Sequence, residues 1–236
     1  MDIELIIAAR EQLTSAETSG MEALYNHYYC GAASDGFQND LAQKDWVILL
    51  KQAGTVQGFS TQKLYTCDGD TFLFSGDTVV DRTIRNQTGL AGAFGHLMEF
   101  LNARHPTDRL FWLLISKGPR TYRFLPTFFN VFYPNPDSLH TPLRGKLDMF
   151  ATRLFGARYS PETHVLHFPE AKDRLRDEWA CEDETRDDTE TRFFKSANPG
   201  WRDGDELACI APLAMDNLNR LGRRVIAHNL PQWRLG

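Results

Sequence analysis

Three consecutive runs of β-branched and aromatic residues, separated by short turn sequences, constrain the fold of this chain more than any other feature. They span residues 46–51, 56–65 and 71–80. Ala53-Gly54 separates the first run from the second, and Asp68-Gly69-Asp70 separates the second from the third. β-branched and aromatic residues favour strands, whereas glycine and aspartate favour turns. The pattern therefore predicts a three-stranded antiparallel meander.

The segments around the meander predict an α/β (α+β) fold. Residues 3–7 are typical of a strand, and residues 21–29 place apolar and aromatic side chains at helical spacing. Between residues 89 and 104 apolar side chains recur every three or four positions, which indicates an amphipathic helix, and a buried strand is expected at 110–116. This order predicts a mixed, mostly antiparallel sheet flanked by helices.

The stretch 132–137, which contains Pro134 and Pro136, marks a boundary within the chain. We expect a first domain at residues 1–138 and a mainly helical C-terminal extension at 139–236 that packs on it as a lid or a dimer contact. The segments expected in the extension are helices at 143–155, 170–179 and 206–226 and a strand at 163–168.

Composition and charge exclude several functions. With a formal net charge of −5, the chain lacks the positive field that nucleic-acid binding requires. Its longest apolar runs fall far short of the roughly 20 residues that span a bilayer, and its first residues lack the basic start of a secretory signal. The four cysteines are far apart and the histidines lack zinc-ligand spacing. We therefore expect a cytoplasmic protein that acts without nucleic acid, membrane or metal.

A polar turn containing glycine joins the strand that ends at residue 80 to the helix that begins at residue 89. Backbone N–H groups at a helix N-terminus have no intrahelical partner and lie at the positive end of the helix dipole, so such a turn can bind a diphosphate. Gly89 would let the phosphate approach closely, the small residues Ala91, Gly92 and Ala93 would keep the first turn open, and Arg85 would donate a charge-assisted hydrogen bond. The alternative is a plain helix start with Thr88 as its N-cap.

The same turn resembles the signature of the GNAT superfamily of N-acetyltransferases, in which Arg or Gln is followed by two residues, Gly, one residue, and Gly or Ala. The residues that match this spacing are Asn86, Gln87, Thr88, Gly89, Leu90 and Ala91. Asn86 departs from the signature at its first position, and Arg85 stands one place early. The order of strands and helices between residues 3 and 133 also resembles that superfamily, which implies a GNAT-like sheet with a splayed central strand pair.

The resemblance implies acyl-CoA or acetyl-CoA as co-substrate. In the superfamily, the strand before the turn pairs through its backbone with the pantetheine arm, and the turn binds the phosphates. The residues to which these roles would fall are Thr78, Val79 and Val80 for the arm, Arg85 and residues 86–91 for the phosphates, and Ser116 and Lys117 for either.

Two residues are candidates for proton transfer. Asp77 lies on the strand beside the expected thioester, where a carboxylate would take a proton from an attacking ammonium or order a water for that purpose; the alternative is that it caps a turn. The resemblance implies a tyrosine acid beyond the strand 110–116, and Tyr122 is the candidate, with core packing as its alternative. Phe128 or Phe129 stands where the superfamily's usual tyrosine falls, and Tyr133 is a further candidate.

Three functional hypotheses follow. The first is an N-acyltransferase that moves an acyl group from acyl-CoA, or from a carrier protein's pantetheine thioester, to a small-molecule amine by direct attack. The second is a GNAT-like acyl-CoA-binding or scaffold protein without turnover. The third is a carrier-protein-dependent synthase resembling those that make acyl-homoserine lactones, in which Lys117, Arg120 and Arg123 would meet an acidic acyl carrier protein. A homodimer is a further expectation.

Overall fold

The predicted meander is present in the computed structural model, which describes residues 2–30, 36–85, 88–106, 109–137, 142–168, 174–176 and 187–235. Its strands are β3 (Trp46–Gln52), β4 (Thr55–Cys67) and β5 (Asp70–Val80), each antiparallel to the next. Gly54 and Gly69 in the two turns have positive φ, at 79° and 77°, as expected for glycine.

One sheet joins strands from the whole chain, in the order β11-β1-β3-β4-β5-β6-β10-β8-β7. The strands beyond the meander are β1 (Glu4–Ala9), β6 (Arg109–Ser116), β7 (Tyr159–Ser160), β8 (Val165–Leu166), β10 (Glu206–Pro212) and β11 (Gln232–Arg234). β5 and β6 are parallel neighbours, whereas β10 is antiparallel to β6. The predicted α/β fold class, with a mixed, mostly antiparallel sheet, is confirmed.

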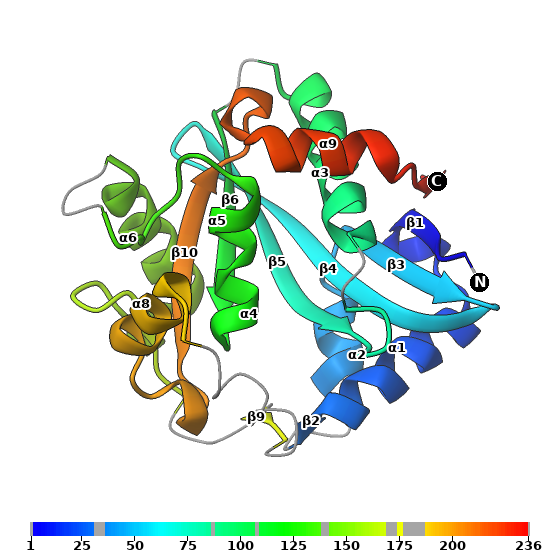
Figure 1. The fold of residues 1–236 in the computed structure, drawn as a ribbon, viewed down its shortest axis with the longest axis horizontal. Helices are drawn as coiled ribbons and strands as arrows, with labels where there is room; N and C mark the ends of the chain where they lie inside the picture. Colours follow the sequence, from blue (N-terminus) through cyan, green and yellow to red (C-terminus); the bar gives the residue numbers. More distant parts are fainter. Residues whose placement is uncertain are drawn as a thin grey trace.

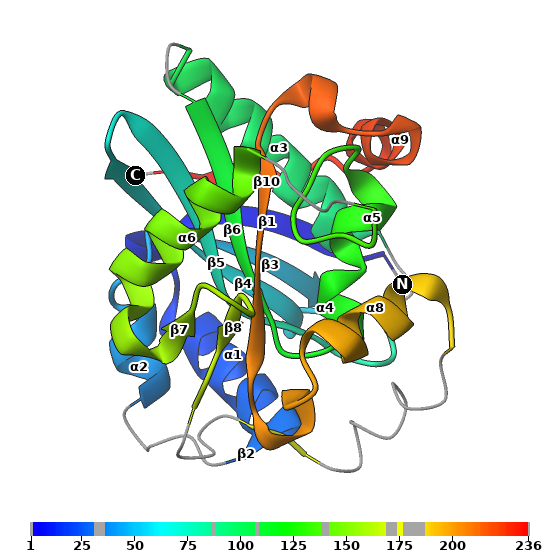
Figure 2. The same ribbon diagram turned by 90° about the vertical axis from the view of Figure 1, so that its left-hand side faces the viewer.

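Helices cover both faces of this sheet (Figures 1 and 2). On one face lie α3 (Gly89–Arg104), α4 (Pro119–Tyr122), α5 (Phe124–Phe128), α8 (Thr189–Ala197) and α9 (Arg220–His228). On the other face lie α1 (Ser15–Tyr28), α2 (Gly36–Leu41) and α6 (Pro142–Phe155). Short 3-10 helices occur at Arg10–Gln12, Gly156–Arg158, Trp201–Asp203 and Met215–Asn217. Among the described residues, none of the helices combines the length and the apolar character that crossing a membrane requires.

The C-terminal extension belongs to the core sheet as well as packing on it. The predicted helix at 143–155 is confirmed as α6, but the predicted helix at 206–226 is wrong over its first part, because residues 206–212 form β10. β10 is an apolar run buried on both faces, and periodicity alone does not distinguish such a run from a buried helix. The described part of the predicted helix 170–179 contains a short strand, β9 (Arg174–Leu175). The division at residue 138 therefore does not separate two sheets.

The C-terminal helix α9 packs directly on α3 because two positions of α3 are glycine. A Cβ atom at Gly95 would lie 2.2 Å from Ile226 Cγ1, and one at Gly92 would lie 2.3 Å from Asn229 Cβ. A residue with a Cβ atom at either position would therefore force the neighbouring side chain to move. Gly92 therefore does not keep the first turn of α3 open, as the sequence suggested, since Asn229 covers it.

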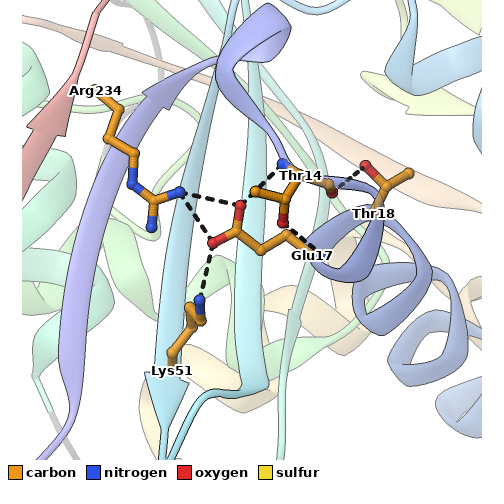
Figure 3. Close-up of polar contacts among 5 residues, drawn as sticks. All are labelled: Thr14, Glu17, Thr18, Lys51 and Arg234. Atoms are coloured by element: carbon orange, nitrogen blue, oxygen red, sulfur yellow. Dashed lines mark hydrogen bonds and ion pairs between the residues drawn. The ribbon is translucent and has the colours of Figure 1, made fainter.

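The two ends of the chain are held together around one buried carboxylate (Figure 3). Glu17, on α1, is 3% exposed; it accepts hydrogen bonds from Lys51 Nζ at 2.9 Å and from Arg234 Nη1 at 3.0 and 3.1 Å. Thr14 completes a capping box with it. Burial raises the pKa of Glu17, but the hydrogen bonds from Lys51, Thr14 and Arg234 outweigh burial and lower it to about 2. We call Glu17, Lys51 and Arg234 the Glu17 clamp.

Candidate functional site

Strands β5 and β6 pair along part of their length and then separate. Their parallel pairing runs from Asp70 opposite Arg109 to Ser75 opposite Leu114. Beyond Ser75, within the described residues, β5 pairs only with β4, while β6 continues to Ser116 alongside β10. Figure 1 shows β5 and β10 diverging toward the lower part of the view. The predicted splayed pair is confirmed, and we call the opening between residues 76–80 and the end of β6 the wedge.

A bulge in β5 explains the separation. Ser60 pairs with Thr78 and Gln62 pairs with Ser75, so β5 contains one more residue than β4 in this interval. A bulge bends a strand and increases its twist. Gly76 permits the bulge, because a Cβ atom there would lie 2.7 Å from Thr61 Oγ1 and 2.9 Å from the ammonium of Lys44.

The backbone of β5 presents alternate residues to the wedge. The N–H of Asp81 donates to Gln57 O of β4 at 2.7 Å. Since neighbouring residues of a strand face opposite sides, Val79 also faces β4, whereas Thr78 and Val80 turn their N–H and C=O groups toward the wedge. Two of the three residues expected to pair with a ligand arm therefore have the required orientation.

Arg85 lies between the wedge and the turn that follows β5. Its Nε donates to Val80 O at 3.0 Å, and its guanidinium lies 4.9 Å from the centre of the Tyr28 ring. The Tyr28 hydroxyl accepts from the N–H of Arg82 at 2.8 Å and donates to Asp81 Oδ2 at 3.2 Å. α1 therefore fixes the start of the turn, and Arg85 covers one wedge-facing carbonyl.

The turn leads into the N-terminus of α3. The first intrahelical bond runs from Gly92 N–H to Thr88 O at 2.9 Å, so the N–H groups of residues 89–91 precede the helical ladder. Thr88 is the N-cap residue, but its side chain makes no capping bond, and its Oγ1 instead accepts from Asn229 Nδ2 at 3.2 Å. Leu90 and Ala91 are half-buried in the first turn.

The predicted turn also includes Asn86, Gln87 and Gly89. Asn86 and Gln87 lie outside the residues that the structure describes. Gly89 is buried, and a Cβ atom there would lie 2.7 Å from Leu5 Cδ2 on β1. The glycine is thus required by the close packing of helix and sheet, which is a different reason from the phosphate approach that the sequence suggested.

Charged and polar residues from several elements converge at the open end of the wedge, which we call the wedge mouth. Lys117 Nζ lies 5.1 Å from the centre of the Tyr29 ring and 3.3 Å from Glu206 Oε1. Burial is the largest cause of a raised pKa for Tyr29; Lys117 and Arg85 oppose the shift, whereas Asp77 and Glu206 add to it. Tyr29 therefore keeps its proton at neutral pH and lies within electrostatic reach of Asp77.

The sequence did not single out Tyr29. Residues 21–29 have helical spacing, but α1 ends at Tyr28, and Tyr29 begins the short strand β2 (Tyr29–Cys30). β2 pairs with β9 of the C-terminal extension, and Arg176 N–H donates to Tyr28 O at 3.0 Å. No local pattern shows a contact between segments so far apart in the chain.

Two other predicted site residues lie inside the protein. Ser116 is fully buried, with its Oγ 3.9 Å from Cys209 Sγ. Tyr122 is also fully buried, and its hydroxyl donates to Pro134 O at 3.0 Å. Its ring contacts Phe132 and Phe194, and burial raises its pKa. This environment favours the packing alternative for Tyr122.

Tyr133 belongs to a buried polar cluster on the face covered by α6. Its hydroxyl lies 2.7 Å from His164 Nε2, and Tyr159 bonds Asp148 at 2.7 Å. In the part of the chain that the structure describes, no group of three or more His, Cys, Asp or Glu residues is arranged to hold a metal ion.

No protein-family model matches the sequence, and no curated protein matches it. Solved structures resemble parts of the fold. A protein from Enterococcus faecalis described as a probable N-acyltransferase has a TM-score of 0.41 at 10% identity, over 56% of this chain and 33% of that one. The GNAT family N-acetyltransferase YhbS from Escherichia coli, in complex with CoA, has a TM-score of 0.40 at 14% identity, over 54% of this chain and 70% of that one.

N-acetylglutamate synthase from Neisseria gonorrhoeae, complexed with coenzyme A and N-acetyl-glutamate, has a TM-score of 0.40 at 10% identity, over 91% of this chain and 36% of that one. This chain thus spans about a third of the length of the Enterococcus and Neisseria proteins.

Proposed function

We propose that the protein is an N-acyltransferase that moves an acyl group from an acyl-CoA thioester to a small-molecule amine. The observation that carries this proposal is the wedge, where β5 leaves β6 after Ser75 and turns the backbone groups of Thr78 and Val80 toward the opening. An arm that contains amides would add beside β5 through main-chain hydrogen bonds, as an extra strand.

The N-terminus of α3 supports a site for the diphosphate of the coenzyme. The N–H groups of residues 89–91 precede the helical ladder, and the helix dipole adds partial positive charge. Because the turn connects β5 directly to α3, a diphosphate bound there would direct its attached arm along the wedge. Arg85 lies between the two and adds positive charge.

The wedge mouth supports direct transfer without a covalent enzyme intermediate. The amine nitrogen would attack the thioester carbonyl carbon; a C–N bond forms, the C–S bond breaks, and the thiol leaves. Asp77 would take one proton of the ammonium. Tyr29, which keeps its proton, would donate it to the departing sulfur and recover a proton from the nitrogen as the amide forms. Tyr29 is better placed for this role than the buried Tyr122.

The charges favour coenzyme A over a carrier protein as donor. Of the basic residues expected to meet an acidic carrier protein, Lys117 pairs with Glu206 and Arg123 pairs with Asp188. Both cations are thus partly neutralised by carboxylates of this chain, which weakens long-range attraction for an acidic partner.

Calorimetric binding of acetyl-CoA and release of free thiol with a panel of primary amines test the proposal. Val80→Pro removes the wedge-facing N–H without removing a bond to β4, so affinity for acetyl-CoA should fall roughly tenfold. Val80→Ala keeps this N–H and is the matched control. If the wild-type protein binds no thioester, or if Val80→Pro and Val80→Ala bind acetyl-CoA equally well, the proposal is wrong.

A further inference from the structure

A chain of buried hydrogen bonds crosses β6, β5 and β4 and ends beside the wedge. Trp112 Nε1 donates to Ser75 Oγ, and Ser75 Oγ donates to Gln62 Oε1, each at 2.8 Å. Gln62 Nε2 donates to Ser60 Oγ at 2.8 Å, and Ser60 Oγ lies 2.6 Å from Thr78 Oγ1. Trp112, Ser75, Gln62 and Ser60 are each at most 4% exposed, so water does not compete with these bonds.

The indole at one end and the buried hydroxyl hydrogens together give the bonds one direction. An indole N–H can only donate, so Ser75 accepts from Trp112. The buried hydrogen of Ser75 requires an acceptor, and Gln62 Oε1 is in position to accept it. The amide oxygen of Gln62 therefore faces Ser75, and its NH₂ group faces Ser60. Ser60 then accepts from Gln62, and its buried hydrogen requires an acceptor, for which Thr78 Oγ1 is in position.

Thr78 is consequently left with a hydrogen to donate at the edge of the wedge. Within its own strand the hydroxyl reaches Gly76 O only at 3.4 Å, which is long for an O–H donor. Thr78 is half-buried on the strand that borders the opening, and its backbone faces the same opening. A carbonyl oxygen in the wedge would offer this hydroxyl a shorter bond.

We propose that the Thr78 hydroxyl donates a hydrogen bond to the carbonyl oxygen of a thioester bound in the wedge, and that Gln62 is the positioning residue that fixes its direction. This inference rests on the proposed function. As the amine adds to the carbonyl carbon, the oxygen gains negative charge and the bond from Thr78 strengthens. The buried chain holds the donor in place before the reaction, so no reorganisation is needed during it.

Thr78→Val tests the donor directly, because valine matches threonine in shape and lacks the hydroxyl. The probes are acetyl-CoA, which has the carbonyl, and free CoA, which lacks it. We expect affinity for acetyl-CoA to fall about 3- to 10-fold with affinity for CoA unchanged, and kcat for thiol release to fall about 100-fold. Thr61→Val is the matched control, since Thr61 lies next to Ser60 and its buried Oγ1 has no hydrogen-bond partner in the described part of the chain.

Gln62→Glu tests the direction of the hydrogen bonds that link Ser75 to Thr78. An ionised carboxylate accepts from both Ser75 and Ser60, so Thr78 would donate to Ser60 and away from the substrate. A protonated carboxyl again donates to Ser60 and restores the original direction, and burial of this site raises the pKa of a carboxyl. The ratio of variant to wild-type kcat should therefore be low at pH 8 and rise as the pH falls, which a loss of packing would not produce.

The two experiments distinguish this inference from the function on which it rests. If wild-type protein neither binds acetyl-CoA nor releases thiol, the proposed function fails. If wild type does both while Thr78→Val retains its kcat and its preference for acetyl-CoA over CoA, the inference alone is overturned. If the ratio of Gln62→Glu kcat to wild-type kcat does not change with pH, the positioning role of Gln62 is overturned. If Gln62→Glu does not fold, the result for Thr78→Val decides whether the inference stands.

Discussion

The Glu17 clamp and the wedge mouth are both clusters of charge drawn from distant segments, but they differ in bonding. Glu17 is 3% exposed, its charged partners lie within 3.1 Å, and its pKa is lowered to about 2. At the wedge mouth the carboxylate of Glu206 is similarly buried, but its partner Lys117, with a side chain that is 31% exposed, lies farther away, at 3.3 Å. A carboxylate saturated with donors stabilises the fold, whereas partly exposed groups beside an opening remain able to meet a ligand. The comparison predicts separate effects on stability and on turnover.

The largest expected effect is loss of stability when the clamp loses its carboxylate. Glu17→Ala leaves the partly buried Lys51 and Arg234 without their buried acceptor, and should lower the free energy of unfolding by about 3 kcal/mol. Urea denaturation measures this change. Glu11→Ala is the control: its carboxylate is 64% exposed and pairs with Arg10, so a change below about 1 kcal/mol is expected. Equal effects of the two substitutions would contradict the assignment.

The clamp should also appear in the acid dependence of stability. The pKa of Glu17 is lower in the folded protein, at about 2, than its ordinary value of 4.5. Its contribution is therefore complete above pH 4.5 and is lost as the pH falls toward 2, because the unfolded chain binds the proton first. The contribution should reach about 3 kcal/mol. Urea midpoints between pH 6 and pH 2.5 should fall more steeply for wild type than for Glu17→Gln; parallel curves would contradict this.

Local patterns account for the parts of the fold that were predicted correctly. The meander depends on alternating strand and turn residues, and α3 depends on apolar spacing over residues 89–104, so each signal lies within its own segment. β10 was missed because a short run buried on both faces has no period that separates strand from helix. The bulge has a sequence signal in Gly76, because a glycine inside a strand often marks a β-bulge.

The candidate site was less predictable because its members meet only through tertiary contacts. The strand that contains Thr78 and Val80 and the turn after it were both predicted from the sequence. This backbone part of the candidate site was therefore predictable. Tyr29 reaches the wedge mouth through the pairing of β2 with β9, which joins segments of the chain that share no local pattern. The direction of the hydrogen bonds that end at Thr78 likewise depends on Trp112, which belongs to another strand.

The smallest expected effect concerns Tyr29 and Tyr122. It tests most directly whether the wedge mouth acts in turnover and not in stability. Tyr29→Phe should lower kcat for thiol release about 100-fold with the melting temperature nearly unchanged, because Tyr29 would act as proton donor at the partly exposed mouth. Tyr122→Phe should instead lower the free energy of unfolding by about 1–2 kcal/mol, since the buried Pro134 carbonyl loses its donor, while turnover per folded molecule is retained. Measuring stability and kcat for both variants separates the roles. The reverse pattern, with Tyr122→Phe inactive and Tyr29→Phe unstable, would make Tyr122 the acid and the wedge mouth a structural cluster like the Glu17 clamp.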